Sequence, residues 1–475
     1  MHIPPKTQPT KTKKKLLIGG AILVILLLLT GGLFILKNPA FQKTIAINGL
    51  SALSKVAQLL PIQPDTKKEL AVTDQLVSTL TVKDGVTRSY LILLQNTAEL
   101  RPGGGFLGQY ANLKIKDGTI LSMTVEDANL LDQRIPNGIA SPWPLAKIMR
   151  TRNWKFRDSN FSPDFPTNAA KAQYFCRLGG CVGGSTFDGV FAVNSQVLDD
   201  LIGVTGPITI AGIEYTSSNA STKLEEQVEK NYLGENVPAE LKQARKNIMK
   251  TLATELAKRL VSLNNIPKLA ELAQTEMRDK NVMLWFKDAN LQSLAASVYW
   301  DGAVSTDWQG DYLMVVDANM GALKTDYYVK RSLDYTVDFT GEHPIATMKY
   351  TYNHTATQGD WRTSDYHTYA RTLTPKGSIY LDRVLTGGVN TTQDFNKTIF
   401  GYKVDVLIGH NQTIAVKYQL PDTITLDNYQ LLIQKQSGVG NIPVSVHLIS
   451  RDGKTYDQAA TLAKDLRLSF SLPEN

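Results

Sequence analysis

The longest uninterrupted hydrophobic run lies near the N-terminus. Between Lys15 and Lys37 the chain has 21 residues without a charge, Leu16–Leu36. At about 1.5 Å rise per residue, a helix of this length crosses the roughly 30 Å hydrocarbon core of a bilayer. The run is also longer than the hydrophobic part of a typical cleaved signal peptide. The pattern therefore predicts a transmembrane helix.

The charges beside this run predict its orientation. Five lysines precede it, and only Lys37 follows it closely. Because positive residues are retained in cytoplasmic segments, residues 1–15 are expected to form a cytoplasmic tail, with the bulk of the chain outside the plasma membrane. Subtracting the five lysines from the net charge of +7 leaves +2. This small excess does not indicate a nucleic-acid-binding surface.

The segment after the predicted membrane helix has hydrophobic residues at helical spacing. They occur at positions 41, 45, 50, 53, 56 and 60 and stop before a proline. This spacing predicts an amphipathic helix, and the polar stretch Pro61–Glu69 is typical of a linker. Residues 37–78 are therefore expected to form a stalk helix and a linker.

Short hydrophobic runs then alternate with helical patterns over residues 79–310. Strands are predicted at Tyr90–Leu94, Tyr110–Ile115 and Ile120–Val125, and Asp117-Gly118 between the last two is a hairpin turn signal. The stretch FDGVFAV predicts a buried strand, and GPITIAG a later one. This alternation predicts an extracytoplasmic α/β domain.

Three helices are predicted between and after these strands. One covers SQVLDDLIG, with Asn194 or Ser195 as its N-cap. Thr222 and Glu225 have the spacing of a capping box before a second helix, and Pro238–Leu263 reads as a long amphipathic third helix.

From residue 311 the pattern changes to alternation of every second residue. It is clearest at positions 333–339, 414–420 and 466–472, and turn residues interrupt the runs frequently. Residues 311–475 are therefore expected to form an all-β sandwich, with an immunoglobulin-like fold as the specific hypothesis.

The distribution of histidine excludes several chemistries from the α/β domain. The six histidines are His2, His343, His354, His367, His410 and His447, so none lies within residues 79–310. A Ser-His-Asp or Cys-His nucleophile and a His-ligated zinc site are therefore excluded there. Catalysis in this domain would need carboxylates, Arg, Lys, Tyr or a hard cation such as Mg²⁺.

The two cysteines, Cys176 and Cys181, occur in the stretch CRLGGC. Their spacing suits a loop closed by a disulfide in an oxidising compartment. Two idle thiols are the alternative, since no histidine lies nearby to complete a zinc site.

A glycine-rich stretch follows one predicted strand and is the first candidate binding site. In QNTAELRPGGGFLG the strand runs into Glu99, Arg101, Gly103, Gly104 and Gly105. Exposed backbone N–H groups beside Arg101 would hold an anion such as a phosphate, although the spacing is not that of a P-loop. The alternative, which the residues favour, is a tight bend between two strands with Arg101 paired to Glu99 or a neighbouring carboxylate.

Two acidic groups are further candidates. In RDSNFSPDFP the polar residues Asp158, Asn160 and Asp164 would ligate a hard cation, or form Asx turns at the start of the helix TNAAKAQYF. The turns are the favoured alternative. The second group, Glu126, Asp127 and Asp132, follows a predicted strand, where α/β sheets place ligand-binding loops. These three acidic residues would be equally typical of an ordinary solvent-exposed surface.

Four blocks of the sequence resemble one family in the family's own order. They are YLILLQNTAELRPGGGFLGQYANLKIKDGTI, NFSPDFPTNAA, FDGVFAVNSQVLDDLIGVTGPITI and DANMGALKTDYYVKRSLDY. Together they resemble domain-of-unknown-function family 4012, a family of membrane-anchored bacterial proteins, over nearly all of the outer region. The chain departs from that family at Gly103, where threonine is more frequent. The family name implies no activity.

The layout is more distantly similar to the LytR-CpsA-Psr phosphotransferases, which attach lipid-pyrophosphate-linked glycopolymers to the cell wall. The similarity implies a membrane-proximal site near Arg101 and Asp127, with Arg245 as a second source of positive charge. In that family an Arg-Asp pair closes the third strand, whereas here the residues are Glu126-Asp127, so the Asp is matched and the Arg is not. A glutamate beside a pyrophosphate would repel it unless a metal ion intervened.

Two functions from different classes follow. The first is a cell-envelope protein that binds a polyprenyl-linked or anionic glycopolymer, or peptidoglycan, near the lipid bilayer. In an extended form of this function, Arg101, Asp127 and Arg245 would also catalyse phosphotransfer, with Mg²⁺ bound to Asp127. The other candidate residues named above would help to bind the glycopolymer. The second is a non-enzymatic envelope scaffold or adhesion protein with a binding β-sandwich. The first predicts that Arg101, Asp127 and Arg245 converge on one long apolar groove.

Overall fold

The computed structural model of the protein describes residues 64–229, 248, 251–256, 259–260, 266–381, 388–427 and 429–470. The predicted membrane helix, the predicted stalk helix and most of the predicted helix Pro238–Leu263 lie outside these ranges. Within them, every helix is too short or too polar to cross a membrane.

A five-stranded mixed sheet forms the centre of the N-terminal half, in the order β3-β2-β1-β4-β7. β1 (Thr87–Arg101), β2 (Gly104–Lys116) and β3 (Thr119–Asp127) form antiparallel hairpins. β4 (Gly189–Asn194) lies parallel to β1, and β7 (Val282–Phe286) antiparallel to β4. β1, β2 and β3 contain the three strands predicted first along the chain, and β4 overlaps the predicted strand FDGVFAV.

The turn between β2 and β3 is formed by Asp117 and Gly118. Both residues have positive φ, 51° and 73°. This conformation matches the twist of the two flanking strands and suits Asp-Gly. The predicted hairpin turn is therefore confirmed.

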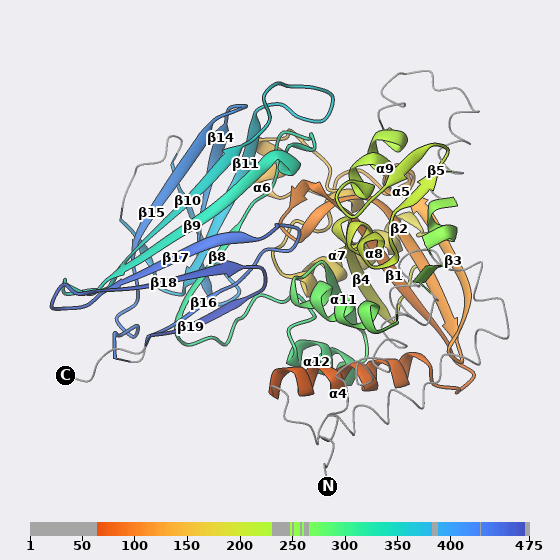
Figure 1. Ribbon diagram of the computed structural model, residues 1–475, viewed down its shortest axis with the longest axis horizontal. Helices are drawn as coiled ribbons and strands as arrows, with labels where there is room; N and C mark the ends of the chain where they lie inside the picture. The colour runs from red at the N-terminus through yellow and green to blue at the C-terminus, as the bar shows by residue number, and fades with distance from the viewer. Residues whose placement is uncertain are drawn as a thin grey trace, which may run out of the picture.

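Helices cover both faces of this sheet (Figure 1). Leu91 and Leu93 of β1 pack against α5 (Ala128–Arg134) and α7 (Phe165–Gly179). Tyr90 and Ile92 point the opposite way, because successive strand residues alternate between faces. The elements on that second side are α4 (Pro64–Leu80), α8 (Gln196–Thr205), α11 (Ile266–Arg278) and α12 (Ala289–Ser297).

Shorter elements connect these layers. They are α6 (Trp143–Lys147), the 3₁₀ helix η3 (Phe156–Asp158), β5 (Ile208–Ile210), β6 (Ile213–Tyr215) and α9 (Ala220–Glu229). β5 and β6 form a separate two-stranded hairpin.

One predicted helix cap is wrong and one is correct in position. α9 begins at Ala220, so Thr222 and Glu225 lie inside the helix and do not form a capping box at its start. Ser195 is the N-cap residue of α8, one of the two predicted candidates, but its side chain makes no cap hydrogen bond and instead accepts one from the backbone N–H of Thr97, at 3.2 Å. In this case a contact with β1 replaces the local cap.

The C-terminal half is a sandwich of two six-stranded sheets (Figure 1). One sheet has the order β12-β15-β10-β9-β17-β18 and the other β13-β14-β11-β8-β16-β19. The predicted all-β architecture is therefore correct. The strands are β8 (Asp311–Val316), β9 (Val329–Asp338), β10 (Ile345–His354), β11 (Tyr366–Pro375), β12 (Ile379–Tyr380), β13 (Asn390–Asp394), β14 (Lys397–Val406), β15 (Asn411–Gln419), β16 (Gln430–Ile433), β17 (Ile442–Ile449), β18 (Thr455–Leu462) and β19 (Leu466–Ser469).

The hairpin between β1 and β2 reaches into this sandwich. Leu100 belongs to the sandwich core, and its N–H donates to Asp326, in the 3₁₀ helix η5 (Thr325–Tyr328), at 3.0 Å. Its carbonyl accepts from Asn319 at 3.0 Å, and Gln436 donates to the carbonyl of Arg101 at 3.0 Å. The two halves are therefore joined through shared core and buried hydrogen bonds.

Candidate functional site

Arg101 lies inside the protein and is bound on several sides. Its side chain is 2% exposed and forms ion pairs with Glu99 (2.9 Å) and Asp158 (3.2 Å). Its Nη1 group also donates to the carbonyls of Leu100 and Asn319. The guanidinium is thus occupied by protein acceptors, which agrees with the alternative in which Arg101 pairs with carboxylates.

The three glycines form the bend between β1 and β2. Gly103 donates its N–H to the carbonyl of Asn160 and accepts from Gln95, while Gly105 accepts from Asn160 Nδ2 at 2.7 Å. A Cβ on Gly105 would lie 2.1 Å from the backbone carbon of Asn96. Gly104 has a φ of 128°, a value that favours glycine. These glycines allow neighbouring backbone segments to pack closely. The backbone groups named here form hydrogen bonds with other residues of the protein.

The acidic residues after β3 are also engaged with the protein. Asp127 is the N-cap of α5 and accepts from the N–H of Asn129 at 2.8 Å. Asp132 is buried and accepts from the N–H of Phe156 and from Arg157. Within the described residues, no group of three or more His, Cys, Asp or Glu side chains is placed to hold a metal ion.

Asp158 and Asp164 have separate structural positions. Asp158 is the buried partner of Arg101. Asp164 is the N-cap of α7, where it accepts from the N–H of Thr167 at 3.0 Å, and its second oxygen accepts from the N–H of Val304. The predicted turn at the start of this helix is therefore confirmed.

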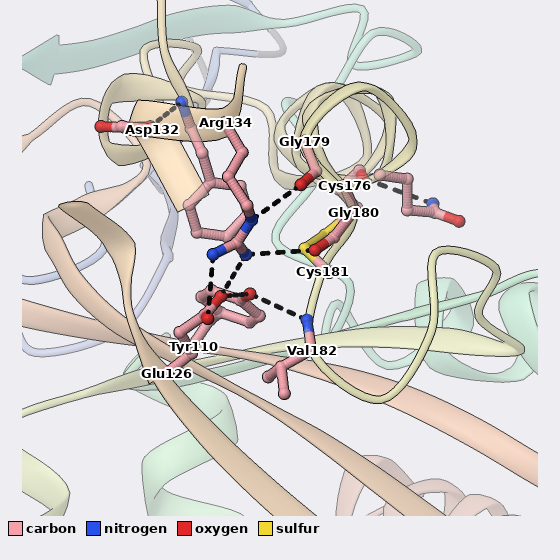
Figure 2. The surroundings of a disulfide bond; sticks show 12 residues. Tyr110, Glu126, Asp132, Arg134, Cys176, Gly179, Gly180, Cys181 and Val182 are labelled. Carbon is pink, nitrogen blue, oxygen red and sulfur yellow. Dashed lines mark hydrogen bonds and ion pairs between the residues drawn. A yellow bond between two sulfur atoms is a disulfide. The ribbon is translucent and has the colours of Figure 1, made fainter. Parts of the chain in front are cut away.

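A compact polar cluster surrounds the disulfide between Cys176 and Cys181 (Figure 2). Arg134 donates to Glu126 and to the carbonyls of Gly179 and Gly180 at the end of α7. Tyr110 donates to Glu126 and accepts from the N–H of Val182. Burial and the adjacent Glu126 raise the pKa of the Tyr110 hydroxyl, so it stays protonated and able to donate. The cluster fastens the disulfide loop to β2, β3 and α5.

A groove of about 2180 Å³ is the main candidate for a binding site. It is lined by the last residues of β1 and β3, the start of β2, α8, α9 and the loop 438–443. Two of its apolar side chains are strongly exposed, Val125 at 48% and Leu130 at 50%. Further apolar lining comes from Leu94, Met123, Leu198 and Leu224. Exposed apolar side chains in a concavity are typical of a site for an apolar ligand group.

Part of the groove lining is polar. It contains hydroxyl groups from β1, from the residue before α8 and from the start of α9 and the segment before it. Thr97 and Ser195 share a hydrogen bond of 3.0 Å. Lys324 also lines the groove and lies 3.9 Å from both Glu99 and Glu225. An amphipathic ligand would find both kinds of surface here.

The structure brings only part of the predicted site to this groove. Among the described residues that the sequence singled out as candidates, Glu126 and Asp127 line the groove, whereas Arg101, Glu99, the three glycines, Asp132, Asp158 and Asp164 do not. Arg245 lies outside the described residues. Sequence analysis missed Val125, Leu130 and Leu198, because nothing local distinguishes a groove residue from a core residue.

Comparisons with known proteins give one clear relationship. No curated protein matches the chain. Protein gbs0355 from Streptococcus agalactiae is 14% identical with a TM-score of 0.28, and the alignment covers 46% of this chain and 75% of that chain. Lin1025 from Listeria innocua is 12% identical with a TM-score of 0.22, with 48% and 86% covered. Both scores are too low to support a fold or a function.

The family comparison concerns the sheet and the helices around it. The matched segment, residues 85–228, runs from β1 to α9 and contains three of the four sequence blocks quoted above. Residues 85–228 therefore match the family described as Protein of unknown function (DUF4012).

Proposed function

We propose that this protein is a membrane-anchored component of the bacterial cell envelope that binds a lipid-linked ligand, such as a polyprenyl-linked glycopolymer, in the groove of its α/β domain. One observation carries the proposal. Val125 and Leu130 expose about half of their surface within a concavity of about 2180 Å³, where a chain of CH₂ and CH₃ groups would cover them.

The polar lining supports an amphipathic ligand over a purely apolar one. Hydroxyls of Thr97 and Ser195 and the amine of Lys324 lie along the same groove. Sugar hydroxyls and a phosphate linkage are groups that such side chains bind. The apolar part of the ligand would then lie along β3 and α5.

Binding is proposed without phosphotransfer. Catalysis at a pyrophosphate needs cationic groups aimed at the developing charge. Arg101 is bound to Glu99 and Asp158, and Arg134, which lies nearest to Glu126, donates to that carboxylate and to two carbonyls. Among the described residues, neither guanidinium forms an ion pair with Asp127. We also propose that the α/β domain is related in fold to the LytR-CpsA-Psr proteins and that the sandwich is immunoglobulin-like. Neither relationship implies an activity, because a fold alone does not determine function.

The test is the lipid content of the full-length protein purified in detergent. Mass spectrometry of extracted lipids should find a polyprenyl species with the wild type and at least tenfold less with Val125→Arg. Leu121→Arg is the matched control, because Leu121 is similarly exposed (53%) on the same strand but does not line the groove. Absence of any polyprenyl species from the wild type would favour the second function expected from the sequence, a non-enzymatic scaffold or adhesion protein.

A further inference from the structure

A closed loop between α5 and η3 contains the short helix α6. Residues 140–153, named here the Trp143 loop, are joined at their ends by a β-bridge between Ala140 and Asn153. Outside this bridge, Gly138 donates to the Asn153 side chain at 2.8 Å, and Trp154 donates to the carbonyl of Ile139 at 2.7 Å. The loop therefore has a fixed base.

The loop is also fixed at its tip. Leu145 is fully buried in a small cluster that includes Phe161 and, from the β-sandwich, Ala318 and Tyr369. The ring of Trp143 packs on the ring of Tyr369, with centroids 5.7 Å apart, but half of its surface remains exposed. Prolines on both sides restrict the backbone of Trp143. Trp143 is thus an exposed aromatic ring held in one place.

The charge of this region is entirely positive. From residue 133 to residue 157 the sequence contains six Lys or Arg residues and no Asp or Glu. Three of the six are bound: Arg134 to Glu126, Arg157 to Asp132, and Lys155 to the carbonyl of Ile135.

The other three cations belong to the Trp143 loop. Lys147, Arg150 and Arg152 are exposed and form no ion pair with any described residue. Arg150 has a φ of 57°, a conformation that an arginine adopts less readily than glycine or asparagine. The fixed loop thus presents three unpaired positive charges beside an exposed tryptophan.

We propose that Trp143, Lys147, Arg150 and Arg152 form a docking surface for an anionic glycopolymer that carries repeated phosphate or carboxylate groups. Several charges along one loop suit a ligand with repeated charges. Arginine binds phosphate and carboxylate in bidentate fashion, and an exposed tryptophan face stacks on the apolar face of a sugar ring.

The position of the loop favours a polymer over a membrane surface. α4 is the first helix that the structure describes, and α6 lies on the opposite side of the molecule from α4 in Figure 1. A surface on that side faces away from the point where the described part of the chain begins. None of the four residues lines the groove, so this surface does not depend on the ligand proposed for the groove.

The experiment measures binding of fluorescently labelled poly(glycerol phosphate) that bears glucose substituents to the full-length protein by anisotropy at several salt concentrations. The variant K147Q/R150Q/R152Q should bind at least tenfold more weakly, with a shallower dependence of log K on log salt, by about two. Trp143→Ala should weaken binding several-fold, and Trp143→Tyr should restore most of it. The control K349Q/K376Q/K417Q removes three exposed lysines from the β-sandwich and should bind like the wild type.

Three outcomes would overturn the proposal. One is wild-type affinity in the triple variant, and another is an equal loss in the lysine control, which would mean unspecific attraction. The third is binding to phosphatidylglycerol vesicles without binding to the polymer, which would assign the loop to a membrane. Circular dichroism verifies that each variant is folded, and Val125→Arg should retain polymer binding, which separates this surface from the groove.

Discussion

The guanidinium of Arg101 and the carboxylate of Asp158 form an ion pair of 3.2 Å in the interior, with side-chain exposures of 2% and 7%. The pair joins the β1–β2 bend to η3, which are far apart in the sequence. Because an unpaired charge is costly to bury, the two groups stabilise each other in the interior. Glu99 forms a second ion pair with the same guanidinium. The most unusual local sequence of the chain therefore fastens the sheet to its neighbours.

Arg101→Met tests this role. The substitution leaves Glu99 and Asp158 buried without their cation and should lower the free energy of unfolding by about 3–5 kcal/mol. The measurement is denaturant unfolding of the purified protein. The triple change Arg101→Met, Glu99→Gln and Asp158→Asn should recover part of the loss. Normal stability combined with loss of ligand from the groove would instead support the catalytic or binding role predicted from the sequence.

Gly105→Ala tests the close packing of the same bend. The new Cβ would lie 2.1 Å from the backbone carbon of Asn96, which cannot move without disturbing β1. We expect a loss of about 3 kcal/mol or more in unfolding free energy. Gly108→Ala is the control on the same strand, since nothing lies within 4 Å of its Cβ position, and it should change stability by less than about 1 kcal/mol. Equal effects of the two substitutions would contradict this explanation.

Asp311 predicts a pH dependence of stability. Burial raises the pKa of its carboxyl to about 6, although hydrogen bonds from Tyr429 and Tyr335 act in the opposite direction. Since the pKa in the folded state exceeds the value of about 4 in the unfolded chain, the folded protein holds this proton more tightly. The resulting stabilisation is complete below about pH 4 and is lost as the pH rises to 6, by about 3 kcal/mol.

The comparison with Asp311→Asn isolates this effect from other titrating groups. Unfolding free energies of both proteins are measured between pH 4 and pH 7. The wild type should lose about 3 kcal/mol relative to the variant across this range. A difference that stays constant with pH, or one that changes in the opposite direction, would show that Asp311 does not titrate there.

The predictions that succeeded rest on neighbours in the sequence. The Asp117-Gly118 turn and the N-cap at Asp164 need only a few consecutive residues, so their chemistry is visible without the fold. The alternation in β9 likewise follows from one buried and one less buried face. Local physical rules are sufficient for such features.

The predictions that failed depend on residues that are distant in the sequence. The capping box at Thr222 is displaced because Asp199 accepts from both the N–H and the hydroxyl of Ser221, which draws this turn into the helix. The groove likewise combines Val125, Leu198 and Asn441. The Trp143 loop, by contrast, is visible in the sequence itself, as a run of cations without acidic residues.

The disulfide and Arg134 should act on the same loop and therefore depend on each other. Replacing Cys176 and Cys181 together by alanine removes a cross-link over a short loop and should lower the unfolding free energy by about 2 kcal/mol. Arg134 also holds this loop, through the carbonyls of Gly179 and Gly180. Arg134→Ala should therefore cost more without the disulfide than with it, because one restraint partly replaces the other.

A double-mutant cycle of unfolding free energies measures this coupling. We expect a coupling energy of about 1 kcal/mol, in the range observed for groups that share one contact network. Arg157→Ala in the same two backgrounds is the control, since Arg157 pairs with Asp132 and does not contact the disulfide loop. Strict additivity for Arg134 would mean that the polar cluster and the disulfide stabilise independent parts of the fold.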